Sequence, residues 1–529
     1  MVTLGNSSNK DIQDVERDGQ SSHDREADER TSLLHEHRPP PNRDGYLDPD
    51  DPAVSPYNLW TVRVLRYLTL FFFLLNFVWW VLLLVSIFVS PPGLHTRGSG
   101  FFDFAFVTLT GGNLLVALLF FAEPSKAMRS LLGVVSFILL VDVIIIVSVT
   151  KVRQEEGPVG IASVVWTCVV ALWCIGTDNV VASAKKEEEE RLTGREETRR
   201  TLKQWLEVLF GTIILSVFVV IAVLMTGTLI IRARDASLEM SGERYRVDGG
   251  KFSVHLACVG NVTHKDGKRV PTILLESGEN PSEAAFEPWL YSTLNNKTIH
   301  RYCYWDRPGY AWSDNAPSPH SAGMSARILS ETLARAGEEG PWVLVSAGYG
   351  SIVSRIFASI HMHEVLGLLL VDPLHEDLLH RVGAPRRGFL LWAHGIISPL
   401  GLYRIPGALF NGRTREDRVY GVSAYQGGKL IKARLQENLV ADSLTKNDIG
   451  SARAILDKKT PVVVVTSGIE AKTDRDWEKK QQDLSTISRN LVDWTVVNKA
   501  PHEVWQTFEG REAMEKGLKA LMAATKPSK

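Results

Sequence analysis

Five uninterrupted apolar blocks between Leu68 and Ile231 restrict this chain more than any other feature of its sequence. A helix needs about 20 residues to cross the hydrocarbon core of a bilayer, and each block has about that length. A helix also satisfies its own backbone hydrogen bonds, which lipid cannot do. We therefore predict an α-helical transmembrane bundle within residues 58–235, with spans at approximately 68–89, 101–122, 131–149, 161–181 and 208–231.

The basic residues between these blocks indicate the orientation of the bundle. The connections on the side of the N-terminus carry Lys126, Arg129 and the long basic run within 185–203, and the opposite side carries fewer basic residues. The positive-inside rule then places the N-terminus in the cytosol and the C-terminal region in a lumen or outside the cell. Asp178 and Asn179 interrupt the end of the fourth block, and the C-terminal region would be cytosolic if that block did not insert.

Residues 1–57 are charged and contain few large apolar side chains, so we predict a disordered cytosolic tail. Within it, Glu29, Leu33 and Leu34 form a pattern that resembles the acidic dileucine signals of vacuolar and lysosomal membrane proteins; a chance match is the alternative. We favour the vacuolar membrane. A mitochondrial membrane is the alternative, because internal signals for that organelle need no basic amphipathic presequence.

Asp142 is the most unusual residue of the apolar blocks because it lies in the middle of the third one. An ionisable side chain is costly to place in lipid, so we expect it to face the other helices or a polar cavity. A functional role is one interpretation. A structural contact between helices is the other, with Asn76, Asn113 or Asp178 as its polar partner.

The pattern changes at about residue 242, after which short β-rich runs alternate with helical ones. This alternation is typical of a mainly parallel sheet that helices cover. The segment Val343–Phe357 reads as a strand, a sharp turn at Gly348 and Gly350, and an amphipathic helix. The sequence therefore predicts one α/β domain over residues 242–529.

The motifs of this domain, taken together, resemble the α/β-hydrolase fold. Residues 271–278 are similar to the third strand and oxyanion loop of those enzymes, 301–314 to their D-R-x-G-x-G-x-S motif, and 343–357 to their nucleophile elbow. The whole chain is similar to fungal multi-spanning membrane proteins with a hydrolase-like C-terminal domain, some of them catalogued as mitochondrial. The resemblance implies an α/β-hydrolase fold with a helical lid at about 378–454.

The resemblance also implies a triad made of a nucleophile at the elbow, an acid after a later strand and a histidine on a late loop. Asp372 and His502 occupy the positions of the acid and the base, and Glu470 and Asp474 are the alternative acids. The position of the nucleophile is occupied by Gly348, which has no attacking atom.

Two further features of the implied site oppose ordinary hydrolase chemistry. Ser346 precedes the turn on the strand and Ser351 follows it in the helix, so we expect neither hydroxyl to be aligned with His502. The implied oxyanion hole consists of the backbone N–H of Tyr349 and an N–H from the loop at Glu279. The Glu279 carboxylate would repel developing negative charge if it pointed into the site. Pointing to solvent is the alternative.

We therefore expect a binding or regulatory module without catalytic activity, which holds a lipid or a small apolar ligand in the former pocket or serves a protein partner. The alternative is an active membrane-bound serine hydrolase that acts on ester, lipid or amide substrates with a non-standard nucleophile. We expect no metal or other cofactor. The net charge of −1 gives no reason to expect nucleic acid as a partner.

The remaining candidate sites concern the side of the membrane. Asn261 and Asn296 begin N-glycosylation sequons, which suit a lumenal domain. Cys258 and Cys303 would lie on neighbouring strands in the hydrolase strand order, so a lumen would allow a disulfide between them; two buried thiols are the alternative. The lid at 378–454 is unusually apolar, which suits contact with a membrane or an apolar pocket; packing of these side chains on the domain below is the alternative.

Overall fold

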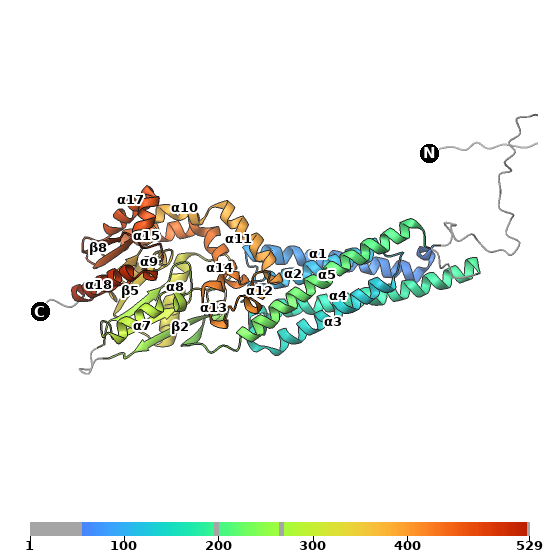
Figure 1. Cartoon of the computed structure of the whole chain (residues 1–529), viewed down its shortest axis with the longest axis horizontal. Helices are drawn as coiled ribbons and strands as arrows, with labels where there is room; N and C mark the ends of the chain where they lie inside the picture. The colour runs from blue at the N-terminus through green and yellow to red at the C-terminus, as the bar shows by residue number, and fades with distance from the viewer. Residues whose placement is uncertain (1–54, 195–199, 264–268, 526–529) are drawn as a thin grey trace, which may run out of the picture.

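The computed structural model describes residues 55–194, 200–263 and 269–525. The molecule is elongated, with a helical bundle at one end and an α/β domain at the other (Figure 1). The predicted sorting motif at residues 29–34 lies outside the described residues.

Within the described residues, five helices are long and apolar enough to cross a membrane, as predicted. The fourth is longer than predicted, because it takes up the charged segment that follows its apolar part. It is also kinked near its start, where Gly157 has a φ of +65° and Pro158 follows. The five helices are α1 (Trp60–Phe88), α2 (Phe101–Leu119), α3 (Lys126–Ser148), α4 (Thr150–Thr193) and α5 (Leu202–Asp235).

Asp142 lies on the buried face of α3 and has no exposed surface. This agrees with the expectation that an ionisable side chain faces the other helices. The suggested partners were wrong: Asp178 pairs with Arg129 at 2.9 Å, and neither Asn76 nor Asn113 forms a hydrogen bond to Asp142 in the described part of the chain. Its role stays a prediction.

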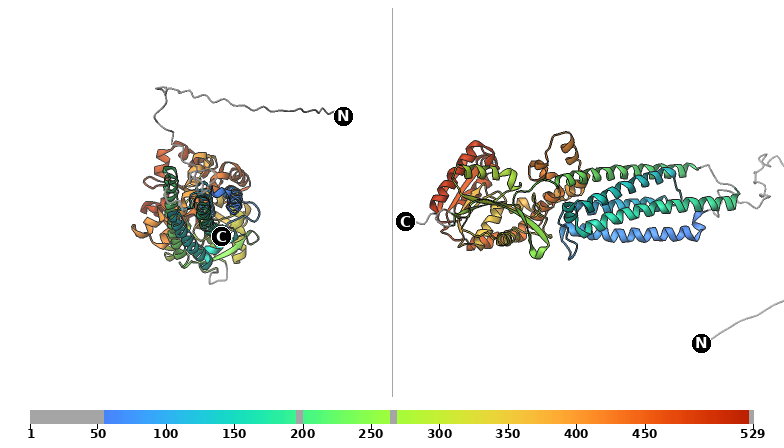
Figure 2. Two further views of the ribbon diagram at one scale, coloured as in Figure 1. Left: turned by 90° about the vertical axis from the view of Figure 1, so that its right-hand side faces the viewer. Right: turned by 90° about the horizontal axis from the view of Figure 1, so that it is seen from below.

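The two ends of the bundle have different neighbours. The connections α1–α2 and α3–α4 and the end of α5 lie against the α/β domain, whereas the start of α1 lies at the far end (Figures 1 and 2). Hydrogen bonds cross this junction: Ser90 N–H donates to the Ser318 carbonyl at 2.9 Å, and the Asn315 side chain donates to the Gly98 carbonyl at 2.9 Å. The described N-terminal end and the α/β domain therefore lie at opposite ends of the bundle.

The α/β domain is built on one eight-stranded sheet in the order β1-β2-β4-β3-β5-β6-β7-β8. β2 runs antiparallel to both of its neighbours, and the remaining pairs are parallel. This arrangement is that of the α/β-hydrolase fold, as predicted. The strands are β1 (Glu243–Val247), β2 (Phe252–Gly260), β3 (Thr272–Glu276), β4 (Arg301–Trp305), β5 (Trp342–Ala347), β6 (Val365–Val371), β7 (Val462–Ser467) and β8 (Leu491–Val497).

Helices cover both faces of this sheet, so its central strands are apolar along their whole length. Alternate residues of β5 show the two faces: Leu344 packs in one core cluster, and Val343 and Val345 pack in the other. The first face is covered by α8 (Ala322–Ala336), α9 (Gly350–Ile360) and α17 (Arg475–Ser485), and the second by α7 (Glu287–Asn295) and α18 (Phe508–Ala524).

The lid between β6 and β7 packs against the membrane bundle, an arrangement that the sequence did not predict. Gly395 lies against the ring of Phe101, and Arg404 and Arg418 both form ion pairs with Asp235 at the end of α5. The lid therefore joins the two parts of the molecule. Its helices are α10 (Leu379–Val382), α11 (Pro385–Ile397), α12 (Arg404–Leu409), α13 (Arg415–Val419), α14 (Gly428–Val440) and α15 (Lys446–Ile455).

Candidate functional site

The turn between β5 and α9 has the shape of a nucleophile elbow. Gly348 adopts a φ of +46° at its apex, in the left-handed region that glycine enters without a steric penalty. Two residues later, a Cβ atom on Gly350 would lie 2.1 Å from the carbonyl oxygen of Ser277, so the close approach of the two loops requires a glycine there. The sequence at this turn therefore fits the backbone geometry.

The predicted acid and base are in contact. His502 Nδ1 lies 2.6 Å from Asp372 Oδ2, and the Asp372 side chain is fully buried. The other carboxylate oxygen, Oδ1, accepts hydrogen bonds from the Ser467 backbone N–H at 3.0 Å and from Trp477 Nε1–H at 2.9 Å. These bonds fix the carboxylate of Asp372 and, through it, the imidazole ring of His502.

The Glu279 carboxylate points towards His502, although its side chain remains 40% exposed. Its Oε2 atom lies 3.3 Å from His502 Nε2. A Cβ atom on Gly348 would lie 2.8 Å from the same oxygen and 3.0 Å from His502 Nε2. The carboxylate therefore occupies the space into which a nucleophilic side chain at the elbow would project.

The charges of Glu279 and His502 stabilise each other. Burial acts to lower the pKa of His502, but its bonds to Asp372 and Glu279 outweigh this effect and raise the pKa to about 11. Burial likewise acts to raise the pKa of Glu279, but His502, Arg307 and Arg434 lower it to about 2. At neutral pH the ring is an imidazolium between two carboxylates, and an imidazolium cannot accept a proton as a general base.

Two arginines hold the loop that carries Glu279. Arg307, in the motif after β4, donates to the carbonyls of Ser277 at 2.5 Å and Gly278 at 2.6 Å. Arg434, from lid helix α14, donates to the Glu279 carbonyl at 2.6 Å. The inward position of the carboxylate therefore depends on both the sheet domain and the lid.

The other predicted site residues form no side-chain hydrogen bond to His502 in the described chain. Ser346 Oγ is buried on β5 without a hydrogen-bond partner in the described chain, and Ser351 Oγ donates to the Gly348 carbonyl at 2.7 Å. Tyr349 is a buried residue at the start of α9, so its backbone lies beside the apex. Of the alternative acids, Asp474 caps α17, and Glu470 lies in the short helix Gly468–Thr473.

Sequence reasoning missed three residues that hold this site: Ser467, Trp477 and Arg434. Arg307, which also holds the site, belongs to a recognisable motif. Ser467, Trp477 and Arg434 lie on segments without one. Trp477 sits on the buried face of an amphipathic helix, where an aromatic residue normally indicates only packing. Its indole N–H was the available signal, since a buried Trp usually finds an acceptor.

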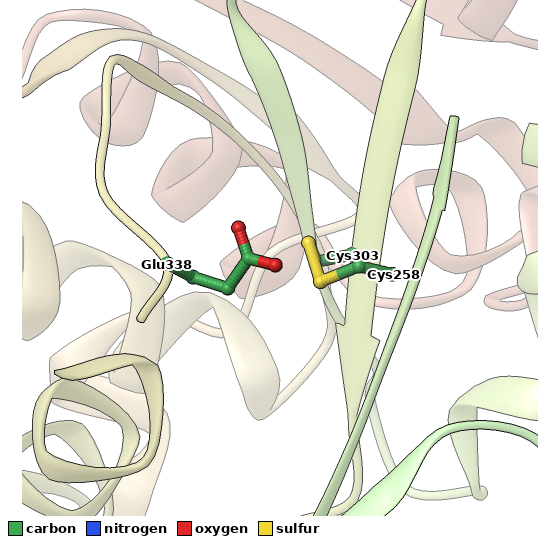
Figure 3. A group of neighbouring side chains, drawn as sticks. All are labelled: Cys258, Cys303 and Glu338. Atoms are coloured by element: carbon green, nitrogen blue, oxygen red, sulfur yellow. A yellow bond between two sulfur atoms is a disulfide. The ribbon is translucent and has the colours of Figure 1, made fainter. Parts of the chain in front are cut away.

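Cys258 and Cys303 are direct partners in the register of β2 and β4 and form a disulfide (Figure 3). Glu338 lies beside them, but its carboxylate makes two hydrogen bonds to Arg301, at 2.7 and 2.9 Å. Bonded sulfurs are not thiolate ligands, so this group does not favour a metal site.

The two sequons lie on the surface of the α/β domain. Asn261 follows β2 and Asn296 follows α7, and both side chains are exposed. An oligosaccharide needs an accessible asparagine in a surface loop. Both positions therefore meet the steric requirement for glycosylation.

We expect His502 to remain protonated at pH 9 in the native protein and to lose its proton at a lower pH in Glu279→Gln. The amide keeps the size of the side chain but removes one of the two charges that raise the pKa. NMR of ¹³C-labelled histidine rings measures this, with His502→Gln to assign the signal. If the two proteins titrate alike, Glu279 does not control the ring.

The same pair sets a pH window for stability. His502 has a raised pKa, so its contribution is complete below about pH 6.5 and is lost as the pH rises towards 11. Glu279 has a lowered pKa, so its contribution is present above about pH 4.5 and is lost as the pH falls towards 2. The pair therefore stabilises the fold most between about pH 4.5 and about pH 6.5. Because both side chains are partly exposed, its contribution is about 1 kcal/mol.

Comparison with known proteins matches both parts of the chain. A family model described as a region of unknown function (DUF2417) matches residues 29–258. An uncharacterized protein of Schizosaccharomyces pombe is 31% identical, and the match covers 93% of this chain and 96% of that protein. An uncharacterized vacuolar membrane protein of Saccharomyces cerevisiae is 24% identical, over 62% of this chain and 59% of that protein.

Among solved structures, a loop variant of a haloalkane dehalogenase from Bradyrhizobium elkanii is 12% identical, with a TM-score of 0.40. The match covers 54% of this chain and 96% of that chain.

Proposed function

This chain belongs to the family of fungal membrane proteins that includes the full-length relative from Schizosaccharomyces pombe, and we propose that its α/β-hydrolase-like domain is a non-catalytic binding or regulatory module. The domain would present a ligand or a partner at the membrane surface instead of turning over a substrate. The former pocket would take a lipid or a small apolar group.

One observation carries this proposal: the Glu279 carboxylate fills the space beside Gly348 and forms an ion pair with His502. A hydrolase needs a nucleophile at the elbow and a neutral histidine to remove its proton. The glycine removes the first requirement and the ion pair removes the second. A carboxylate there also opposes the negative charge of an oxyanion. Three requirements of the reaction are therefore unmet at one place.

The test is labelling of the purified full-length protein with a fluorophosphonate, which forms a serine–phosphorus bond as fluoride leaves. We expect no label, since loss of the nucleophile from a triad lowers turnover on the order of a millionfold. An active serine hydrolase in the same tube shows that the probe works. Labelling that disappears in Ser346→Ala or Ser351→Ala contradicts the proposal and supports an active serine hydrolase instead.

A second candidate function rests on the same carboxylate. Glu279 Oε2 lies beside the elbow apex and next to the His502–Asp372 pair, which is also where a carboxylate nucleophile would act. Its oxygen would attack an electrophilic carbon and form an ester as the leaving group departs. The ester is uncharged, so His502 would lose one stabilising charge and its imidazolium could give a proton to the departing group. The neutral ring could then take a proton from the water that hydrolyses the ester and restores the Glu279 carboxylate. An epoxide probe that modifies Glu279 would favour this candidate.

We also propose that the protein resides in the vacuolar membrane, with the N-terminus in the cytosol and the α/β domain in the lumen. The name of the Saccharomyces cerevisiae relative supports the compartment. The disulfide and the exposed sequons support the lumenal side, because both modifications form in an oxidising secretory compartment. The membrane would also contact the lid, where Phe389, Tyr403 and Phe410 are exposed.

A further inference from the structure

A cavity lies where the bundle, the sheet domain and the lid meet, at a distance from the His502 site. Its volume is about 90 Å³. The wall is formed by the beginnings of α2 and α4, the end of α5, the loop after β4 and the lid from α12 to α14. One water molecule needs only about 10–15 Å³ of such volume, so a ligand of several atoms fits.

The wall of this cavity carries an excess of positive charge. Five basic side chains and two carboxylates line it: Lys151, Arg232, Arg404, Arg418 and Lys429, with Glu155 and Asp235. Glu156 lies behind the wall and pairs with Arg232 at 2.6 Å, which adds a third carboxylate. Arg244 and Asp314 lie close to the lysines of the wall but pair with each other, so the excess of two positive charges remains, and burial of uncompensated charge is strongly unfavourable. The wall therefore favours an anionic occupant.

Several hydrogen-bond donors in the wall are not fully used by the described part of the protein and could bind a ligand. Lys151 takes part in no ion pair within the described residues, and its ammonium stacks on the Trp312 ring at 4.3 Å. Arg404 Nε is buried without a hydrogen-bond partner in the same part of the chain. Lys429 donates one hydrogen bond to the Ala311 carbonyl at 2.6 Å and pairs with Glu155 only at a long 3.7 Å, so its ammonium group has a further donor for a ligand; burial lowers its pKa. An anion in the cavity would satisfy these three groups together.

The kinds of donor indicate a phosphate group. Guanidinium and ammonium groups together are the usual phosphate ligands, through forked hydrogen bonds and point charge. Helix α14 begins in the wall at Gly427 and Gly428, without a side-chain cap, so the positive end of its dipole adds to the field. The hydroxyls of Ser99 and Ser398 also converge there, at 3.0 and 2.9 Å from where a Cβ atom on Gly428 would lie.

The position of the cavity suits the head of a lipid. Arg232 directly follows the last apolar residues of α5, and Lys151 comes shortly after those of α3. Charged side chains at helix ends lie at the depth of lipid headgroups. The lid beside the cavity exposes Leu402, Tyr403 and Phe410, whose side chains are 48%, 67% and 80% exposed. Basic pockets between membrane helices on the cytoplasmic side bind anionic headgroups, and the same pairing of charges would act in this cavity.

We propose that this junction cavity binds a phosphate group, carried by a membrane phospholipid or present as free inorganic phosphate. The bound group neutralises the excess charge of the wall and bridges α4, α5 and α14. Because the cavity is separate from the Glu279–His502 pair, the proposal does not depend on whether the α/β domain is catalytic.

The experiment uses the full-length protein in detergent and measures binding by calorimetry and by thermal shift. The probes are inorganic phosphate, dihexanoyl phosphatidic acid and, as a phosphate-free control, dihexanoylglycerol. The variants are Lys151→Gln and Lys429→Gln, one from α4 of the bundle and one from α14 of the lid. Lys126→Gln is the matched control, because it removes an exposed charge at the other end of the bundle.

We expect the phosphate probes to bind and dihexanoylglycerol not to bind. Each of Lys151→Gln and Lys429→Gln weakens binding at least ~10-fold, the effect of one lost charged hydrogen bond, and Lys126→Gln has no effect. Tighter binding of phosphatidic acid than of phosphate identifies the lipid as the source, and equal binding identifies free phosphate. The absence of binding at millimolar concentration by the native protein overturns the proposal. So does native-like binding by either wall variant.

Discussion

Gly348→Ser combined with Glu279→Ala is expected to give a protein that a fluorophosphonate labels at least ~100-fold faster than either single variant. A serine at the elbow supplies the attacking oxygen, and general-base assistance is worth 10²- to 10⁴-fold. Gly348→Ser alone gains little, because its Cβ atom would lie 2.8 Å from Glu279 Oε2 and the ion pair keeps His502 protonated. Mass spectrometry of the labelled peptide provides the measurement.

Two matched variants show whether the gain arises as described. Glu279→Ala alone removes the carboxylate without adding a nucleophile and should stay unlabelled. His502→Ala added to the double variant should abolish the label, because no base then takes the serine proton. If a folded double variant is not labelled, Asp372 and His502 are not aligned with the elbow, and the implied relation of this site to a catalytic triad is wrong.

Removal of the disulfide by Cys258→Ala together with Cys303→Ala is expected to destabilise the α/β domain by about 4 kcal/mol. The bond joins two strands across a sequence separation of 45, and a cross-link of that length restricts the unfolded chain by about this amount in the chain-entropy description. The melting temperature in detergent should fall accordingly. Reductant should lower the melting temperature of the native protein and leave that of the variant unchanged.

Cys168→Ala is the control for this experiment, since Cys168 is a free thiol within α4. It removes a sulfur without removing a cross-link, so its effect should be small. Rapid alkylation of both Cys258 and Cys303 in the untreated native protein would contradict the prediction. Glycosylation gives an independent measure of the side of the membrane. A glycosidase should shift the band of the native protein on a gel, and the combined variant Asn261→Gln and Asn296→Gln should show no such shift.

Much of the architecture could be predicted because local patterns determine it. Each apolar block became a helix, since no other element can satisfy its backbone in lipid. The segment Val343–Phe357 formed its strand, turn and helix because small residues at the turn permit a conformation that larger ones resist. The strand order followed from a resemblance spread over several motifs, each weak by itself.

The state of the site could not be predicted, because it depends on contacts between distant segments. Whether Glu279 points inward is decided by His502 and Arg434, which are far from it in sequence. The packing of the lid on α5 depends on Asp235, which reads in the sequence only as the charged end of a helix. The junction cavity likewise collects charges from three parts of the chain, and none of them belongs to a motif.

The attachment of the lid has a mechanical consequence. Asp235 fixes α12 and α13 to the end of α5, and Arg434 of the same lid holds the backbone at Glu279. A membrane helix changes its tilt when the thickness of the bilayer changes. Tilting of α5 would therefore be expected to displace the lid and, through it, the loop that carries Glu279. The Glu279–His502 pair would thus be connected to the physical state of the lipid in which the chain is embedded.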